Sequence, residues 1–227
     1  MSRKIAQEVK AILREGDLLR LLSFIETVPP KKVVQPLIQT FYKADSIARW
    51  HAITAFGRVL DSIAQQDMED ARIIIRRLMW SLNDESGGIG WGAPEAMAEA
   101  MANNQTLAEE YCRILVSYIW EDGNYLEYLP LRRGALWGVM RLAQTHPAIF
   151  NSIDYAADLV KDYLHDNDPE SRALAALALG FAGKKEFCDE IANMLSDRRP
   201  VQLYLDQKLR DLSVADAAAT SLKHLKC

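Results

Sequence analysis

The segments DSIARWHAITAFG (residues 45–57) and DPESRALAALALG (residues 168–180) share the pattern D-x-x-x-R-x-x-A-x-x-A-[FL]-G. They lie 123 residues apart, which is three times 41. Steps of 41 residues from Ala52 reach only small residues: Ala93, Gly134 and Ala175. A fifth, imperfect copy follows after a two-residue slip, at Asp211 and Ala218. The chain therefore repeats with a period of 41 residues, which is typical of helical-repeat proteins.

Each repeat pairs the signature segment with an apolar segment that precedes it, so each is predicted to be a helical hairpin. The preceding helices are predicted over 32–43, 68–82, 105–120, 148–165 and 187–196. No single hairpin can bury its apolar face, so neighbouring hairpins must stack. We expect an all-α fold, a right-handed α-α superhelix, with two N-terminal helices over 3–14 and 17–28.

One departure from helix is expected near residues 201–212. Val201, Leu203 and Leu205 alternate with other residues before a polar break at Asp206 and Gln207. This alternation predicts a short β-hairpin, and an irregular helix is the alternative. The chain is then one domain: a cap over 1–28, repeats over about 31–63, 68–103, 105–144 and 147–182, and a C-terminal cap over 184–227.

The signature and its period resemble HEAT repeats, particularly the short type of phycobilisome-lyase-like proteins. The segment LNDESGGIGWGAPEAM (residues 82–97) is similar to that of a small bacterial HEAT-repeat family without an assigned activity. The resemblance implies the solenoid fold over nearly the whole chain. It also implies, by repeat type alone, a bilin-lyase-like chaperone of a tetrapyrrole as one possible function.

The composition excludes overall disorder and disfavours nucleic-acid binding. The chain has 227 residues, 49% of them hydrophobic, which is enough to bury a core. Its 27 Lys and Arg against 31 Asp and Glu give a net charge of −4. A protein that contacts many phosphates needs a basic surface, which this balance does not favour.

The cysteines and apolar segments predict a cytoplasmic protein. Cys112, Cys188 and Cys227 form no CxxC pair and have no nearby histidine cluster, so they are expected to be reduced thiols. The first residues are too charged for a secretory signal. The longest apolar run, residues 173–183, is shorter than the ~20 residues that cross a bilayer.

The repeat register predicts which residues line a concave groove. On the signature helix, Ala52 and Ala55 face the neighbouring helix, and the opposite side is expected to face the groove. At the 41-residue spacing, that side carries two columns: Trp50, Trp91, Arg132 and Ala173, then Thr54, Glu95, Leu136 and Leu177. Arg133 lies on the shoulder of the groove, and Trp137 is one position from the packing column. Alternatively, Trp50 stacks on Trp91 inside the core.

Two arginines of the signature are excluded from this site. Arg49 and Arg172 each follow an aspartate by four residues, Asp45 and Asp168. Residues four apart on a helix are neighbours, so these pairs are expected to be structural ion pairs.

The second repeat departs from the pattern with four glycines between Gly87 and Gly92. Glycine disfavours helix and Pro94 is tolerated in a first turn, so this helix is expected to start near Ala93. The preceding loop would lead into free N–H groups that bind a carboxylate or phosphate. The loop matches no nucleotide-binding motif. A purely structural bend, with Glu95 as a first-turn acid, is the alternative.

These patterns favour a binding module over an enzyme. No nucleophile, zinc or metal-hydroxylase motif occurs, and no metal or cofactor is expected. The expected partner is a protein or peptide, or a small anionic ligand. The proposed ligand-binding residues are Trp50, Gly88, Gly90, Trp91, Glu95, Arg132, Arg133 and Trp137. The enzyme alternative is a HEAT-like alkylpurine DNA glycosylase, which the acidic charge opposes.

Overall fold

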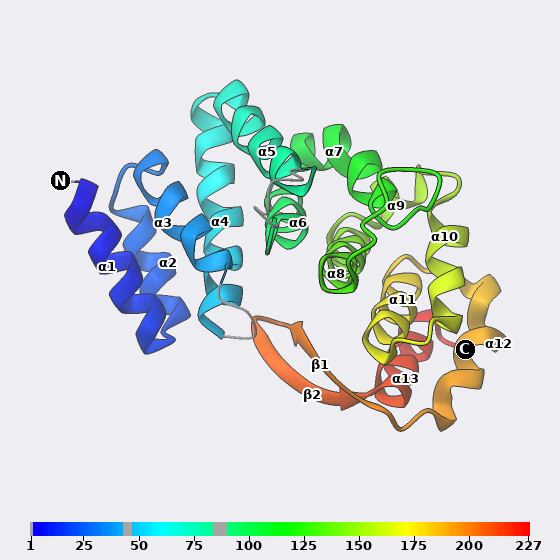
Figure 1. Cartoon of the computed structure of the whole chain (residues 1–227). Helices are drawn as coiled ribbons and strands as arrows, with labels where there is room; N and C mark the ends of the chain where they lie inside the picture. Colours follow the sequence, from blue (N-terminus) through cyan, green and yellow to red (C-terminus); the bar gives the residue numbers. More distant parts are fainter. Residues whose placement is uncertain (1, 43–46, 84–89) are drawn as a thin grey trace. The chain divides into compact units, whose positions relative to one another are not determined.

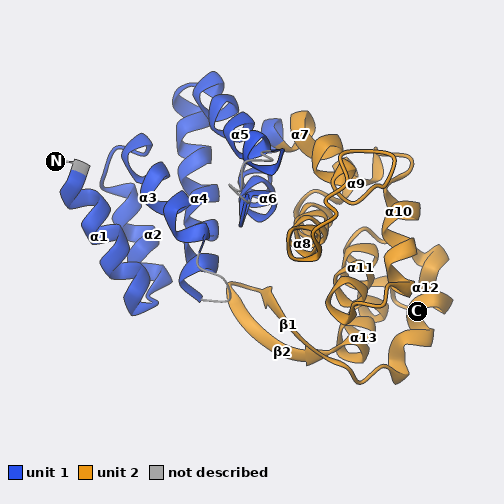
Figure 2. Ribbon diagram, in the orientation of Figure 1, with its two compact units in different colours: residues 1–107 blue, residues 108–227 orange. Residues whose placement is uncertain are grey.

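The computed structural model describes residues 2–42, 47–83 and 90–227. Within them, the regular secondary structure is helical apart from one two-stranded sheet (Figure 1). The chain divides into two compact units, Met1–Leu107 and Ala108–Cys227 (Figure 2). Each unit has its own buried core. The fold is that of a helical-repeat solenoid with a short C-terminal hairpin, as the repeat predicts.

The first unit contains six helices in its described residues and the first residues of a seventh. They are α1 (Ser2–Glu15), α2 (Leu18–Glu26), α3 (Lys31–Phe41), α4 (Ile47–Gln66), α5 (Met68–Leu82), α6 (Ala93–Asn103) and the start of α7 (Gln105–Ser117). Helix α4 lies at the centre and packs on α2, α3, α5 and α6. The start of α6 at Ala93 confirms the prediction that the glycines delay this helix.

The second of the two columns predicted to line the groove is buried, so the prediction that this side of the signature helices is exposed is wrong. Thr54 is 5% exposed and Glu95 is 3% exposed, and Leu136 and Leu177 are each 1% exposed. The signature helices carry apolar residues around their whole circumference, because each has neighbours on several sides. In the first column, Trp50, Trp91 and Arg132 are partly exposed and Ala173 is buried. The packing column is buried as predicted, at Ala52, Ala93, Gly134, Ala175 and Ala218.

The glycine that ends the signature is required by close contact between helices. A Cβ at Gly57 would lie 2.6 Å from the carbonyl oxygen of Glu99 on α6. A Cβ at Gly180 would lie 2.5 Å from the hydroxyl of Ser221. Two repeats therefore use the same glycine to bring consecutive signature helices together, which explains its place in the motif.

The second unit contains the rest of α7 and the remaining elements of the chain. They are α8 (Leu129–Thr145), α9 (Pro147–Asn151), α10 (Ala156–Asp162), η1 (Tyr163–His165), α11 (Pro169–Phe181), η2 (Lys185–Phe187), α12 (Cys188–Ala192), η3 (Asn193–Ser196), β1 (Pro200–Leu205), β2 (Lys208–Ser213) and α13 (Val214–Leu225). Helix α11 packs between α8 and α13 (Figure 1). The helix predicted over 148–165 is in fact three short pieces, and α7 ends at Ser117 rather than at residue 120.

The predicted β-hairpin is confirmed. Strands β1 and β2 pair antiparallel, with Leu205 opposite Lys208. The two turn residues have positive φ angles, 50° at Asp206 and 61° at Gln207, as a two-residue hairpin turn requires. The Trp137 indole on α8 donates a hydrogen bond of 2.8 Å to the carbonyl of Tyr204. This bond fixes the hairpin to the helical core.

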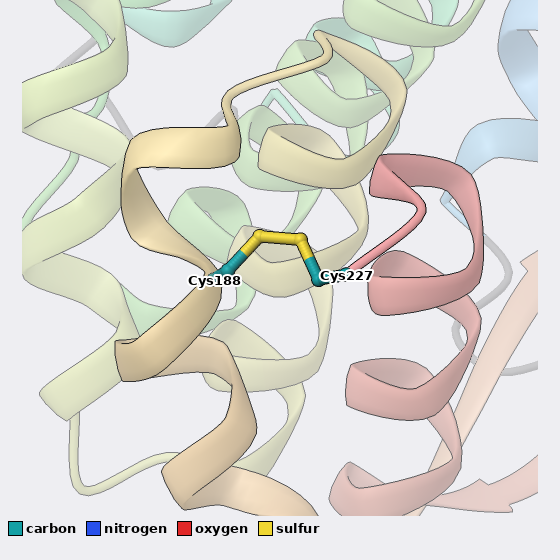
Figure 3. Close-up of a disulfide and its surroundings, with 2 residues drawn as sticks. All are labelled: Cys188 and Cys227. Atoms are coloured by element: carbon teal, nitrogen blue, oxygen red, sulfur yellow. A yellow bond between two sulfur atoms is a disulfide. The ribbon is translucent and has the colours of Figure 1, made fainter.

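The expectation of three free thiols is wrong for two of them. Cys188 at the start of α12 and Cys227 beyond the end of α13 form a disulfide (Figure 3). They are 39 residues apart in sequence, with Cα atoms 6.3 Å apart, so only tertiary packing brings them together. Cys112 is free and buried, and burial raises the pKa of its thiol. The cysteines therefore do not support a reducing compartment.

Over the described residues, no helix combines the length and the apolar character that a bilayer crossing requires.

Candidate functional site

Glu95 and Arg49 form a buried ion pair between α6 and α4. The Glu95 Oε1 atom accepts a hydrogen bond from the Nη2 of Arg49, and their side chains are 4% and 12% exposed. The other carboxylate oxygen, Oε2, is buried without a hydrogen-bond partner in the described part of the chain. The guanidinium carbon of Arg49 lies 4.9 Å from the ring centre of Trp50. Glu95 thus joins two repeats inside the first unit.

One of the two signature arginines pairs differently from the helical pair expected for it. For Arg49 the expected partner, Asp45, lies outside the described residues, and within them Arg49 pairs with Glu95. Arg172 lies 3.3 Å from Asp197, and the prediction that it pairs with Asp168 is wrong. Asp168 is instead occupied by Arg133 and by its own helix start.

The glycine-rich loop is described only in part. Gly88 lies outside the described residues. Gly90 is buried, and a Cβ there would lie 2.8 Å from the carbonyl oxygen of Ser81. Gly92 caps α6 with a φ of 74°, a left-handed conformation that favours glycine. These two glycines meet structural demands of the turn, and Trp91 between them is partly exposed.

Three residues of the predicted site lie on α8 and have internal partners. Arg133 donates to Asp168 through Nε at 3.0 Å and lies 3.2 Å from Glu170. Arg132 donates through Nη1 to the carbonyls of Leu126 and Glu127, at 3.1 and 2.9 Å. Trp137 is 4% exposed and holds the hairpin. These contacts hold α8 to α11, to the preceding segment and to β1.

The Arg133 contact also sets the charge of Asp168. Burial alone would raise the pKa of this carboxyl group. The hydrogen bonds from Arg133, and from the amide and hydroxyl of Ser171 at 2.8 Å each, outweigh burial and lower the pKa. Asp168 is therefore a charged N-cap of α11, as the sequence of a DP helix start indicates.

The second unit contains a cavity of about 420 Å³ that the sequence analysis did not predict. One wall is the segment that follows α7, and the other is formed by α10, η1 and the residue after η1. The lining residues are Ile119, Trp120, Glu121, Asp122, Tyr125, Leu159, Asp162, Tyr163, His165 and Asp166. We call this cavity the α7–α10 pocket. Its size falls in the range of known ligand-binding pockets.

Hydrogen bonds fix the first wall of the α7–α10 pocket. The amide of Leu126 donates to the carbonyl of Tyr118 at 3.0 Å, which folds the segment back on itself. The Asn124 side chain donates to the hydroxyl of Ser117 at 2.9 Å. The wall is therefore held in place by the chain itself.

A second set of contacts joins the two walls. The Tyr163 hydroxyl donates to the carbonyl of Ile119 at 2.8 Å. Burial, followed by the interaction with Tyr125, raises the pKa of Tyr163, so this hydroxyl stays protonated. The ring of Trp120 lies 5.2 Å from that of Tyr155. The pocket is thus preformed, with Tyr163 held by the opposite wall and Trp120 held by a ring outside the lining.

The lining of the pocket is acidic and aromatic. It includes four carboxylates, one imidazole and three aromatic rings, and no lysine or arginine is among these lining residues. Among the described residues, no group of three or more His, Cys, Asp or Glu side chains is arranged to hold a metal ion. The carboxylates are therefore spread around the pocket rather than gathered at one point.

The pocket could have been suspected from one sequence feature. The segment WEDGNY (residues 120–125) combines a turn signal with acids and aromatic rings at both ends. The 41-residue period does not reveal this segment, because it lies between the helix predicted over 105–120 and the next signature segment.

Comparison with known proteins identifies a relative. No protein-family model matches the chain. A protein of Archaeoglobus fulgidus, described as uncharacterized, is 30% identical over 199 residues, which cover 84% of this chain and 96% of the archaeal protein. The chain belongs to the family of this archaeal protein.

Solved structures show the same fold. An engineered protein matches with a TM-score of 0.56 and 15% identity, over 98% of this chain and 96% of its own. A designed armadillo repeat protein in complex with peptide (KR)4 matches with a TM-score of 0.53 and 15% identity, over 97% of this chain and 99% of its own. A computationally designed armadillo repeat protein for modular peptide recognition also has a TM-score of 0.53, at 14% identity and 99% coverage of both chains. At this identity the likeness shows the helical-repeat fold alone.

Proposed function

We propose that the chain is a non-catalytic binding module that holds a segment of another protein. The observation that carries this proposal is the preformed α7–α10 pocket. It has the size of a ligand site, and its walls are fixed before any ligand arrives, which lowers the entropic cost of binding. Helical-repeat neighbours that bind peptides support the same class of function.

The residues predicted for the groove take different parts in this proposal. Trp50 and Trp91 are partly exposed, and we propose them as further contacts for the partner. Arg132 holds the segment that carries Tyr125 through two hydrogen bonds and a ring contact at 5.1 Å. Arg133 and Trp137 stabilise the fold around α8. The DNA glycosylase and tetrapyrrole-chaperone alternatives gain no specific support from the described residues.

Selection of peptides on the intact chain tests the proposal. A library of random displayed peptides is selected on the full chain, and the affinity of enriched peptides is measured by fluorescence anisotropy. The variant Leu159→Trp fills the pocket from α10. The control variant Ile73→Trp adds the same side chain at an exposed position of α5.

We expect enriched peptides whose Kd rises at least tenfold in Leu159→Trp and stays unchanged in Ile73→Trp. Thermal unfolding of both variants establishes that they are folded. The proposal is wrong if no peptide is enriched over a chain-free control, or if Leu159→Trp binds the enriched peptides as tightly as the native chain.

A further inference from the structure

The α7–α10 pocket has a charge that selects among ligands. Glu121, Asp122, Asp162 and Asp166 line it, and the imidazole of His165 is the one basic group in its lining. Two cations lie beside this lining: the Lys161 ammonium is 3.9 Å from Asp162, and the Arg132 guanidinium carbon is 5.1 Å from the ring centre of Tyr125. Several carboxylates around one open pocket repel an anion and attract a cation. An anionic ligand is therefore the wrong class for this pocket.

The spread of the carboxylates argues for an organic cation rather than a metal ion. A metal needs several oxygen ligands on one small centre, and the described residues contain no such group. A guanidinium group is larger, carries its charge over a plane and presents five donors to separate acceptors. Acids at several places on the wall suit that shape.

The aromatic rings of the pocket favour the same ligand. Trp120, Tyr125 and Tyr163 line it, and a guanidinium group stacks on such rings by cation–π attraction. The chain itself contains this pairing, because the guanidinium carbon of Arg132 lies 5.1 Å from the ring centre of Tyr125. Rings already fixed by internal contacts lose little freedom when a ligand stacks on them.

We propose that the α7–α10 pocket binds the guanidinium group of an arginine side chain presented by the partner protein. This inference rests on the proposed function and adds the chemistry that the partner must present. The carboxylates supply charge-assisted hydrogen bonds, the aromatic rings supply stacking surface, and Leu159 and Ile119 contact the aliphatic stem.

A small probe tests the pocket without a peptide. N-acetyl-arginine amide is titrated into the ¹⁵N-labelled full chain and followed by NMR. N-acetyl-citrulline amide serves as the uncharged probe of nearly the same shape. We expect saturable shifts confined to residues 119–125 and 159–166 with the arginine probe, and binding at least tenfold weaker with the citrulline probe. Equal binding of the two probes, or shifts elsewhere only, would overturn the inference.

Matched charge variants separate the pocket from the net charge of the chain. The double variant Glu121→Gln and Asp162→Asn removes two lining acids. The control double variant Glu127→Gln and Asp158→Asn removes two exposed acids that do not line the pocket. We expect at least a tenfold loss of affinity for the arginine probe in the first and less than a twofold change in the second. Similar losses in both would show only a general charge effect and contradict a site here.

The peptide selection then tests the source of the cation. In enriched peptides, replacement of arginine by citrulline should weaken binding at least tenfold, and free arginine should compete far less well than the peptide. Enriched peptides that tolerate citrulline would overturn the inference and leave the proposed function standing. Specific binding of the small probe without any enriched peptide would overturn the proposed function, and with it the protein source of the arginine, and would leave only guanidinium binding by the pocket.

Discussion

At the scale of single residues, charged groups inside each unit link its repeats. The Arg49–Glu95 ion pair joins α4 to α6, and Arg133–Asp168 joins α8 to α11 in the second unit. Charge burial costs free energy, which a close partner offsets. Removal of one partner leaves the other charge buried, so these residues are sensitive points of the fold.

We predict that Glu95→Gln lowers the free energy of unfolding by about 3–5 kcal/mol, because it replaces a buried carboxylate that pairs with the Arg49 guanidinium by a neutral amide. Urea unfolding measures this change. The control is Glu69→Gln, which removes an exposed carboxylate paired with Arg76 on α5 and is expected to leave stability unchanged. Equal changes in the free energy of unfolding would show that the buried pair contributes no more to stability than the exposed pair.

His51 makes stability depend on pH. It is 6% exposed, and burial lowers its pKa below 6.5, although the nearby charge of Asp17 opposes this shift. Because the pKa of the imidazole is lower in the folded chain, the unfolded chain binds the proton more tightly, and acid therefore favours unfolding. Its contribution is fully present above pH 6.5, the unfolded value, and is lost as the pH falls from there toward the folded pKa.

The predicted consequence is a loss of stability that depends on His51 as the pH falls below 6.5. Urea unfolding at several pH values should give a smaller slope in His51→Gln than in the native chain. The same slope in both proteins would exclude His51 as the cause.

At the scale of elements, regular helices were predictable and irregular ones were not. The prediction for 68–82 matches α5, and the hairpin near 201–212 matches β1 and β2. The prediction of one helix over 148–165 was wrong, because three short pieces can together bury the same apolar residues as one helix. The wall of the α7–α10 pocket was not predicted, because α7 ends at Ser117 and the next residues are held by the bonds between Leu126 and Tyr118 and between Tyr163 and Ile119.

The disulfide is an element-scale constraint that sequence could not supply, because it depends on α12 meeting the end of α13. It closes a loop with a sequence separation of 39 residues, and the chain-entropy account gives about 4 kcal/mol for a loop of this size. We predict that Cys227→Ser lowers the free energy of unfolding by up to that amount.

Thermal unfolding with and without a phosphine reductant checks this prediction. The reductant should lower the Tm of the native chain toward that of Cys227→Ser and leave the Tm of the variant unchanged. If the reductant and the substitution both leave the Tm unchanged, the disulfide does not stabilise the second unit.

At the scale of the whole molecule, the 41-residue repeat accounts for the fold, and its irregular part accounts for the proposed site. The repeated residues are those that make contacts shared between hairpins, such as the close approach of neighbouring helices at Gly57 and Gly180. A ligand site is a departure from those shared contacts, so the period alone does not reveal it. The glycine-rich loop departs from the repeat visibly in the sequence. The pocket beside the acidic turn over 120–125 becomes apparent only in the structure.

The most direct test of the central claim is the position of a bound arginine probe. Intermolecular NOEs are measured between the side-chain methylene protons of N-acetyl-arginine amide and the full chain. The account predicts NOEs to the ring protons of Trp120 and Tyr125, which disappear when the citrulline probe replaces it. NOEs only to aromatic rings outside the α7–α10 pocket, or no NOEs at saturating probe, would contradict the account.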